Sequence, residues 1–265
     1  MTTTTTTTTT TTNGTNGAQN VAAPKITLYT NHMCPYAHRA HITLEELGLP
    51  YEEVLIDLTT PRPQWYLDIN PRGLVPSIKY TVPGIYDEEI LTESAIVAQF
   101  LVDSFPGHLM PASRGGEPDA PLQRARIGFF VDTWNSKIGS QYAALLFAPT
   151  ASEKETKISS LLSALEAEIE PLLATTSAER PFFGGSEHLT FAEVMAAPFV
   201  LRWYSLARDG EVIPASLAEK LDALPKFGVW ARAVTAHPSV RKVYPEEAAV
   251  AGTKRKPASM QAGKK

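Results

Sequence analysis

Two successive patterns along the chain predict an α/β domain followed by an all-helical domain. Between residues 24 and 105, strand-like and helical runs alternate in the order β-α-β-α-β-β-α, which predicts a small mixed sheet with helices packed on its faces. Beyond residue 119 only helical spacing of apolar residues remains. Residues 106–118 are rich in proline, glycine and serine and indicate a linker between the two domains.

The first domain opens with an apolar strand and a helix that follows it closely. Strand Ile26–Tyr29 leads into a polar turn, and the helix Pro35–Leu47 ends where Gly48 follows. The later elements are a β-rich run Tyr51–Asp57, a short helix Pro63–Ile69, a strand Leu74–Lys79, a turn at Pro83-Gly84, a strand Ile85–Glu88 and a helix from Ser94 to about Ser104.

The second domain, residues 119–247, is expected to consist of helices alone. The segments with helical spacing are Leu122–Phe147, Ser152–Ala174, Thr190–Arg208 and Pro225–Ala236. Thr190 and Glu193 have the spacing of a capping box, which fixes the start of the third segment. The aromatic residues of this domain are too many for one helix face, so we expect some in the core and others beside a cleft that faces the first domain.

Both ends of the chain lack the pattern of a folded element. Residues 1–23 contain a run of threonines without an apolar face, and residues 248–265 mix alanine, glycine, lysine and proline. We expect a disordered threonine-rich tail and a disordered basic tail. The cluster Lys254-Arg255-Lys256 favours a solvated basic tail over a nuclear address.

Composition excludes several classes of function. The formal charge of −4 and the pI near 5.9 give no sign of nucleic-acid binding. No apolar run approaches the roughly 20 residues that span a bilayer, and no secretory signal is evident. The chain has 1 cysteine, so it can form neither an internal disulfide nor a cysteine-cluster zinc site. A cytoplasmic location and no membrane partner are expected.

That cysteine, Cys34, stands at the start of a helix. It follows the strand and the polar turn and directly precedes Pro35, which fits the first helical turn because proline lacks an N–H. A thiol there faces unpaired backbone N–H groups and the positive end of the helix dipole, which favours the thiolate. The alternative, a small buried cysteine without a reactive role, needs neither the turn nor the proline.

Three further features of the first domain suit a peptide ligand. Pro76 cannot pair as an interior strand residue, so it should lie at an edge or carry a cis bond, leaving the Val75 backbone free to pair with an extended ligand. Glu93 and Ser94 open a helix and can hold an ammonium and a carboxylate. Arg62, between two prolines, can bind a second carboxylate. Each feature alone has an ordinary explanation, but together with a thiolate they describe a receptor for glutathione.

The histidines near Cys34 do not indicate a metal site. His32, His38 and His41 lack a recognised ligand spacing, and no cysteine or pair of acids accompanies them. We therefore expect no metal.

Three motifs in this order resemble the cytosolic glutathione transferases, in particular the omega-like cysteine type of fungi. They are Cys34-Pro35-Tyr36-Ala37, Asn70-Pro71-Arg72-Gly73-Leu74-Val75-Pro76 and Glu93-Ser94-Ala95-Ile96, and a weaker similarity continues through Pro225-Lys226-Phe227, Trp230 and His237-Pro238. The resemblance implies a thioredoxin-like N-terminal domain, a helical C-terminal domain and a homodimer.

The resemblance also implies roles for single residues. Cys34 would be the catalytic thiol, Val75 would pair with the glutathione backbone before a cis Pro76, Glu93 and Ser94 would hold the γ-glutamyl end, and Arg62 stands where the family often has lysine. The pocket for a small hydrophobic electrophile or disulfide is expected to be lined by His32, Phe130, Trp134 and Trp203. The C-terminal helix that contributes to this pocket in omega enzymes is not evident after Tyr244.

The function that follows is that of a glutathione transferase, with glutathione as co-substrate. Such an enzyme transfers glutathione to, or removes it from, an electrophile or a disulfide, in detoxification or fungal secondary metabolism. One alternative is a thioltransferase or dehydroascorbate-type reductase that forms a mixed disulfide on Cys34. Another is a non-catalytic binding protein of the same fold, which the retained glutathione-site residues disfavour.

Overall fold

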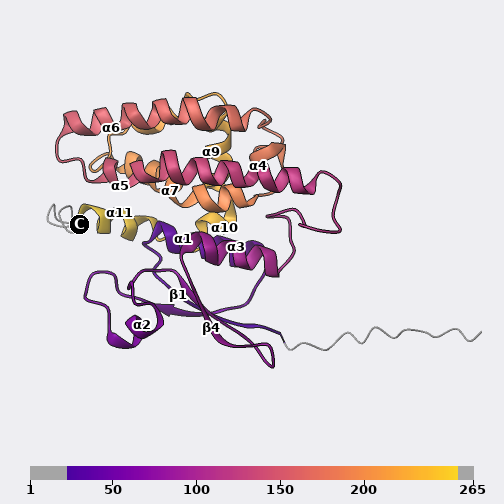
Figure 1. The fold of residues 1–265 in the computed structure, drawn as a ribbon. Helices are drawn as coiled ribbons and strands as arrows, with labels where there is room; N and C mark the ends of the chain where they lie inside the picture. The colour runs from indigo at the N-terminus through magenta and orange to yellow at the C-terminus, as the bar shows by residue number, and fades with distance from the viewer. Residues whose placement is uncertain (1–22, 256–265) are drawn as a thin grey trace, which may run out of the picture.

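The structure of the protein, a computed structural model, describes residues 23–255. Residues 1–22 and 256–265 lie outside the described residues, and with them almost all of the predicted threonine-rich tail and the end of the basic tail. A small sheet with a short helix beside it forms one end of the molecule, and a layer of helices forms the other (Figure 1). Helices α1 (Pro35–Glu46) and α3 (Ser94–Ser104) lie between them.

The sheet is mixed and has the order β2-β1-β3-β4. β1 (Lys25–Thr30) pairs in parallel with β2 (Glu52–Leu55) and antiparallel with β3 (Ser77–Val82), and β3 pairs antiparallel with β4 (Tyr86–Thr92). The parallel pair is connected through α1, which is the crossover that parallel strands need. The predicted α/β order is confirmed, although β3 begins three residues later than the sequence suggests because Val75 and Pro76 precede the ladder.

Two apolar clusters fix the sheet to its helices. One joins β1 and β3 to α1 and α3 through residues such as Leu28, Ile78 and Leu101, all fully buried. The other lies on the opposite face of the sheet, where Tyr29 and Val75 pack with Tyr66 of the short helix α2 (Gln64–Ile69). Cys34 packs against this second cluster, so the cluster holds the surroundings of the thiol in place.

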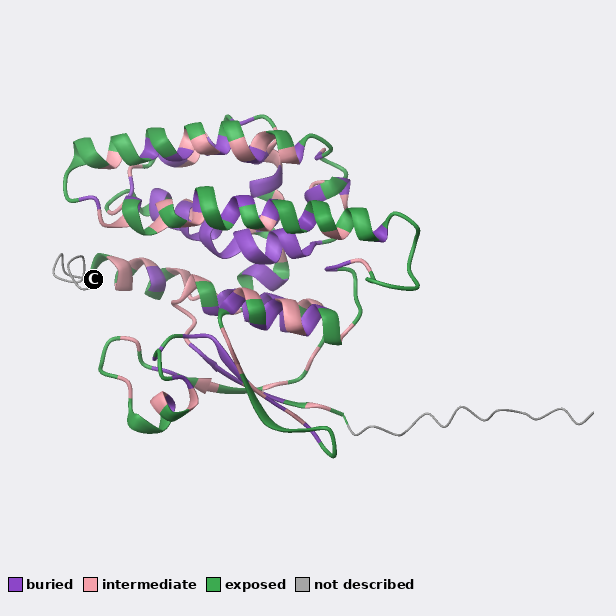
Figure 2. Ribbon diagram, in the orientation of Figure 1, coloured by how far each residue is buried: buried purple, intermediate pink, exposed green. Residues whose placement is uncertain are grey.

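Over the described residues, the named elements of the second domain are all helices, and they pack around α7, which is buried along most of its length (Figure 2). Thr190 and Glu193 form the predicted capping box at the start of α7. The elements are α4 (Ala120–Thr133), η1 (Trp134–Gly139), α5 (Ser140–Leu146), α6 (Ala151–Ala164), η2 (Leu165–Ile169), η3 (Glu170–Leu173), η4 (Phe183–Gly185), α7 (Phe191–Asp209), α8 (Ser216–Asp222), α9 (Phe227–Ala236), α10 (Pro238–Arg241) and α11 (Glu246–Lys254).

The structure differs from the sequence prediction in three places. The predicted helices Leu122–Phe147 and Ser152–Ala174 are each interrupted by a π-helical turn, η1 and η2. The linker 106–118 is not merely solvated, because Leu109 and Met110 within it are buried in the helical core. None of the helices over residues 23–255 combines the length and the apolar character needed to cross a bilayer.

The third difference is a helix where the sequence predicted the start of a disordered tail. α11 covers Glu246–Lys254 and packs on α7, and its residue Ala249 is buried. The sequence does not reveal this helix because its residues contain no stripe of large apolar side chains. The prediction of disorder from residue 248 is therefore wrong up to residue 254.

Candidate active site

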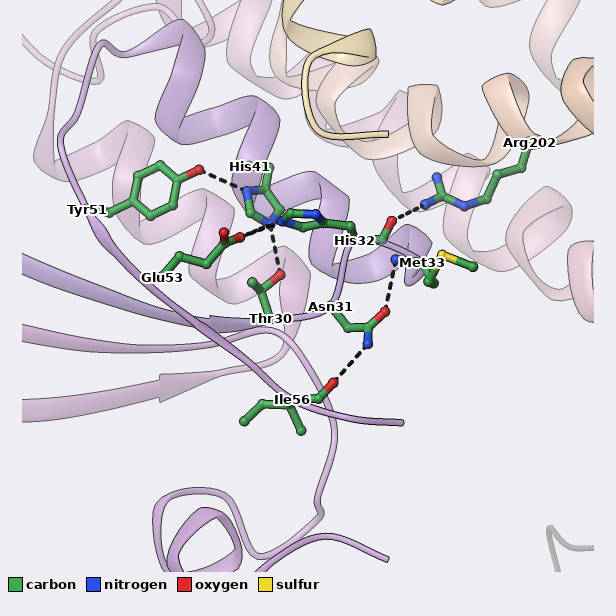
Figure 3. Close-up of polar contacts among 9 residues, drawn as sticks. All are labelled: Thr30, Asn31, His32, Met33, His41, Tyr51, Glu53, Ile56 and Arg202. Atoms are coloured by element: carbon green, nitrogen blue, oxygen red, sulfur yellow. Dashed lines mark hydrogen bonds and ion pairs between the residues drawn. The ribbon is translucent and has the colours of Figure 1, made fainter. Parts of the chain in front are cut away.

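Cys34 lies where the turn after β1 enters α1. Asn31 holds the turn, because its side chain donates to the Ile56 carbonyl (2.8 Å) and accepts from the Met33 backbone N–H (2.9 Å) (Figure 3). The Cys34 backbone N–H donates to the Asn31 carbonyl (3.0 Å), and Pro35 then opens the helix. Cys34 is the N-cap of α1, as predicted, and its thiol is half-buried.

The segment opposite the thiol carries Val75. The Cys34 Sγ lies 3.9 Å from the Val75 carbonyl oxygen, in the geometry of a weak S–H donor. Tyr66 Oη and Asn70 Nδ2 both donate to the Leu74 carbonyl, so the end of α2 holds this segment in place. The Val75–Pro76 peptide bond is cis, as predicted.

Glu93 and Ser94 stand side by side at the start of α3. Glu93 is the N-cap, with a φ of 69° that is unusual for a residue with a Cβ. Its carboxylate forms an ion pair with Arg72 at the surface. Ser94 is the first residue of the helix rather than its cap, and its buried hydroxyl accepts from Arg39 Nη1 at 3.2 Å.

Arg39 is a buried cation next to this site, which no pattern in the sequence indicated. Its guanidinium also donates to the Met195 carbonyl (2.9 Å) and to Asn135 Oδ1 (2.9 Å), and it stacks over the ring of Tyr36 at 5.3 Å. Burial lowers the pKa of Arg39 to about 10, and the Tyr36 and Cys34 groups partly oppose this shift. Arg39 thus places a positive charge between the active-site helix and the second domain.

The guanidinium of Arg62 is hydrogen-bonded to backbone carbonyls, which the sequence did not predict. Its Nε donates to the Gly73 carbonyl (3.0 Å), and its Nη1 donates to the carbonyls of Asp57 (2.7 Å) and Thr60 (2.5 Å). A fourth contact joins Nη2 to the Leu58 carbonyl (3.4 Å). Because these bonds use most of its N–H groups, Arg62 shapes the loop before α2 instead of offering a free fork to a carboxylate.

The predicted second-substrate pocket is not formed by the residues named for it. Phe130, Trp134 and Trp203 are each 0 % exposed, in the core of the helical domain, and so offer no surface to a substrate. They were misassigned because a helical stripe does not reveal which face turns toward a cleft. The His32 side chain points toward β2 instead, where it contacts Glu53 (Figure 3).

A second buried arginine ties the active-site turn to the helical domain. Arg202 donates to the carbonyl of His32 (3.1 Å) and to Nδ1 of His38 (3.1 Å), and its guanidinium lies 4.6 Å from the ring centroid of Tyr244. Burial, followed by the charge of Arg202, lowers the pKa of His38 well below its ordinary value. The one sequence signal for Arg202 is a charge inside the otherwise apolar run of residues 198–203.

α11 also reaches this turn. A Cβ at Gly252 would lie 2.7 Å from the Met33 Cε, so glycine allows the helix to come close to the residue before Cys34. A helix that was not evident from the sequence therefore does follow Tyr244, and α11 borders the active-site turn.

Two of the histidines meet an acid that the sequence spacing did not connect with them. His32 Nε2 lies 2.7 Å, and His41 Nε2 3.5 Å, from Glu53 Oε1, since β2 runs beside β1 and the turn (Figure 3). Burial lowers the pKa of His41 to about 4, and Glu53 opposes this shift. The sequence suggested no pair of acids beside these histidines, and the fold brings them a single one, Glu53.

Similarity to known proteins agrees with this arrangement. The family model "Glutathione S-transferase, N-terminal domain" matches residues 33–104. "Probable glutathione S-transferase GSTU1" of Oryza sativa subsp. japonica is 30% identical over 79% of this chain and 88% of its own length. Glutathione S-transferase omega-1 of Sus scrofa is 26% identical, over 83% and 81% of the two chains.

Among solved structures, glutathione transferase Omega 2C from Trametes versicolor superposes with a TM-score of 0.71 at 27% identity and covers 88% of this chain and 98% of its own. The thioredoxin-like first domain and the helical second domain are features that the chain shares with this fold. The chain therefore belongs to the glutathione S-transferase family, as an omega-like glutathione transferase.

Proposed function

We propose that the protein binds glutathione along the Val75 segment and exchanges it with disulfide substrates through a mixed disulfide on Cys34. The observation that carries this proposal is the 3.9 Å approach of the Cys34 Sγ to the Val75 carbonyl. A peptide that pairs with the Val75 backbone, as strand addition requires, brings its own cysteinyl sulfur to the Cys34 thiol.

The γ-glutamyl end of glutathione suits the start of α3. The Glu93 carboxylate is partly exposed and can accept from the ammonium, while the first N–H groups of the helix can donate to the carboxylate. The unusual φ of Glu93 supports this role, because strained backbone is retained where the residue serves a site. Arg62 contributes its charge to the far carboxylate at longer range, since its N–H groups are occupied.

The exchange needs one protein sulfur and two molecules of glutathione. The Cys34 thiolate attacks the glutathione sulfur of a mixed disulfide R–S–S–G, the S–S bond breaks, and R–S⁻ leaves with the electron pair and takes up a proton. A second glutathione thiolate then attacks the sulfur bound to Cys34, which releases oxidised glutathione and restores the Cys34 thiolate. Because the chain has 1 cysteine, the resolving thiol must come from solution.

Assembly and location form part of the same proposal. Helices α3 and α4 are neighbours, joined by the ion pair between Arg124 and Asp103, and each exposes large apolar side chains. Ile96, Leu122 and Phe129 are 57%, 53% and 60% exposed, which supports a homodimer through this face. A reducing compartment, the cytoplasm, keeps a lone thiol available.

The test compares Cys34→Ser with the unaltered protein. After incubation with a glutathionylated peptide, intact mass should show one glutathione on the wild type and none on the variant, and peptide deglutathionylation should be lost. Glutathione binding, measured by calorimetry, should persist in the variant because the Val75 and Glu93 contacts remain. Full deglutathionylation by Cys34→Ser, or only thioether products with electrophiles, would contradict the exchange mechanism.

A further inference from the structure

A cluster of two imidazoles and one carboxylate lies on the side of the active-site turn that faces β2. It consists of His32 from the turn, His41 from α1 and Glu53 from β2, and one nitrogen or oxygen of each lies within 4.8 Å of the others. We propose that these residues form a binding site for a divalent transition-metal ion, with Zn²⁺ the best match to two imidazoles and one carboxylate.

The distances are close to those that a tetrahedral ion requires. With bonds of about 2.0–2.1 Å, two ligands of a tetrahedral Zn²⁺ lie about 3.3 Å apart. His41 Nε2 and Glu53 Oε1 are already 3.5 Å apart. His32 Nε2 lies 2.7 Å from the same oxygen, so this imidazole must move back by about 0.6 Å to admit the ion. His32 can do so because it is part-exposed.

The side chains that surround the three proposed ligands also have the arrangement found around a metal ion. The Nδ1 of His41 lies 3.1 Å from the Tyr51 hydroxyl, so a partner orients the ring while Nε2 faces Glu53 (Figure 3). The Thr30 hydroxyl, 2.8 Å from Nε2, is the group that the ion would replace as the partner of this nitrogen. The turn itself is held by Asn31 and by the bond from Arg202 to the His32 carbonyl.

The exposure of the three side chains indicates how the site would hold the ion. The His41 side chain is 1% exposed, whereas those of His32 and Glu53 are 32% and 31% exposed. The ion would therefore be anchored from within and open to solvent on one side, where water completes the coordination. Bound there, it would join the turn two residues before Cys34 to β2 and α1, and so stiffen the approach to the thiol.

The experiment uses the full chain without a histidine tag, treated with chelator and kept reduced. Zn²⁺ binding is measured by calorimetry, and Co²⁺ serves as a spectroscopic probe of tetrahedral geometry. We expect one ion per chain. His32→Gln and Glu53→Gln should each weaken Zn²⁺ binding at least about tenfold, and Tyr51→Phe, which removes an outer partner, by about tenfold. Thermal melts of the metal-free variants check that they fold.

Two control variants test other origins of binding. His108 also pairs with a glutamate, since its Nε2 lies 2.8 Å from Glu46, so His108→Gln is matched to His32→Gln. Cys34→Ser removes the one thiol. Both should bind Zn²⁺ as the wild type does. No binding to the wild type, or loss of binding only in His108→Gln or Cys34→Ser, would overturn the proposal. The proposed disulfide exchange does not depend on the result.

Discussion

Replacing Arg39 by lysine separates its charge from its geometry. The guanidinium joins three elements, because it donates to Ser94 of α3, to Asn135 of η1 and to the Met195 carbonyl of α7. A lysine keeps the positive charge but has a single ammonium group on a flexible chain. We expect it to reach one of these acceptors and to leave the other two without their donor.

The expected loss of stability follows from those two bonds. Hydrogen bonds to charged groups contribute about 1.5–3 kcal/mol each, so Arg39→Lys should lower the free energy of unfolding by about 3–6 kcal/mol. That is a large part of the roughly 5–15 kcal/mol typical of folded proteins. At about 2–4 °C per kcal/mol, Tm should fall by at least about 6 °C.

The assay is thermal and urea unfolding of Arg39→Lys beside Arg232→Lys. Arg232 forms an exposed ion pair with Asp222, and such pairs contribute about 0–1 kcal/mol, so this control should unfold almost as the wild type does. Glutathione affinity should also fall in Arg39→Lys, because Ser94 at the proposed γ-glutamyl site loses its donor. Equal unfolding of the two variants would refute the view that the guanidinium fork holds the domains together.

Two other predictions concern pH and assembly. The pKa of His38 is lowered in the folded protein, so below about pH 6.5 the unfolded chain binds a proton that the folded one does not. The free energy of unfolding should therefore fall by up to about 1.4 kcal/mol per pH unit as the pH drops below that value. His38→Gln should flatten urea-derived stability between pH 7 and 5 relative to wild type, and parallel curves would show that His38 does not contribute. Phe129→Asp should convert the proposed dimer to a monomer, because it puts a charge on the exposed face of α4. Light scattering after size-exclusion chromatography measures the change. The control is Leu55→Asp on β2, a side chain that is about as exposed as Phe129, and it should leave the dimer intact. A monomeric wild type, or a dimer unaffected by Phe129→Asp, would remove this interface.

The elements that the sequence predicted well are those with local signals. The start of α1 was set by Pro35, the start of α7 by the capping box of Thr190 and Glu193, and the extent of α3 by its apolar run. For Pro76 the local restriction on proline left an edge position or a cis bond open, and the family resemblance implied the cis bond that is present. Such signals depend on only a few neighbouring residues, so they can be recognised in a single sequence.

Other assignments failed because they depend on what a side chain faces. Trp134 and Trp203 have the same helical spacing whether they line a cleft or fill the core, and the packing of α7 put both in the core. α11 has no large apolar stripe, and only the surface of α7 and Met33 beside Gly252 gives it a place. Arg62 looked free because its carbonyl partners belong to loops whose path the sequence does not reveal.

By itself, the sequence determined the order of the strands and helices, the single thiol at the start of α1 and the motifs that mark a glutathione transferase. Only the tertiary structure decided that Arg39 and Arg202 are buried against the helix and the turn that carry that thiol, and that His41 and Glu53 meet at this turn. The physical reason is the separation along the chain over which each interaction acts. A cap or a proline acts on its own backbone, whereas a buried charge or a set of metal ligands is defined by groups that come together only when distant segments pack.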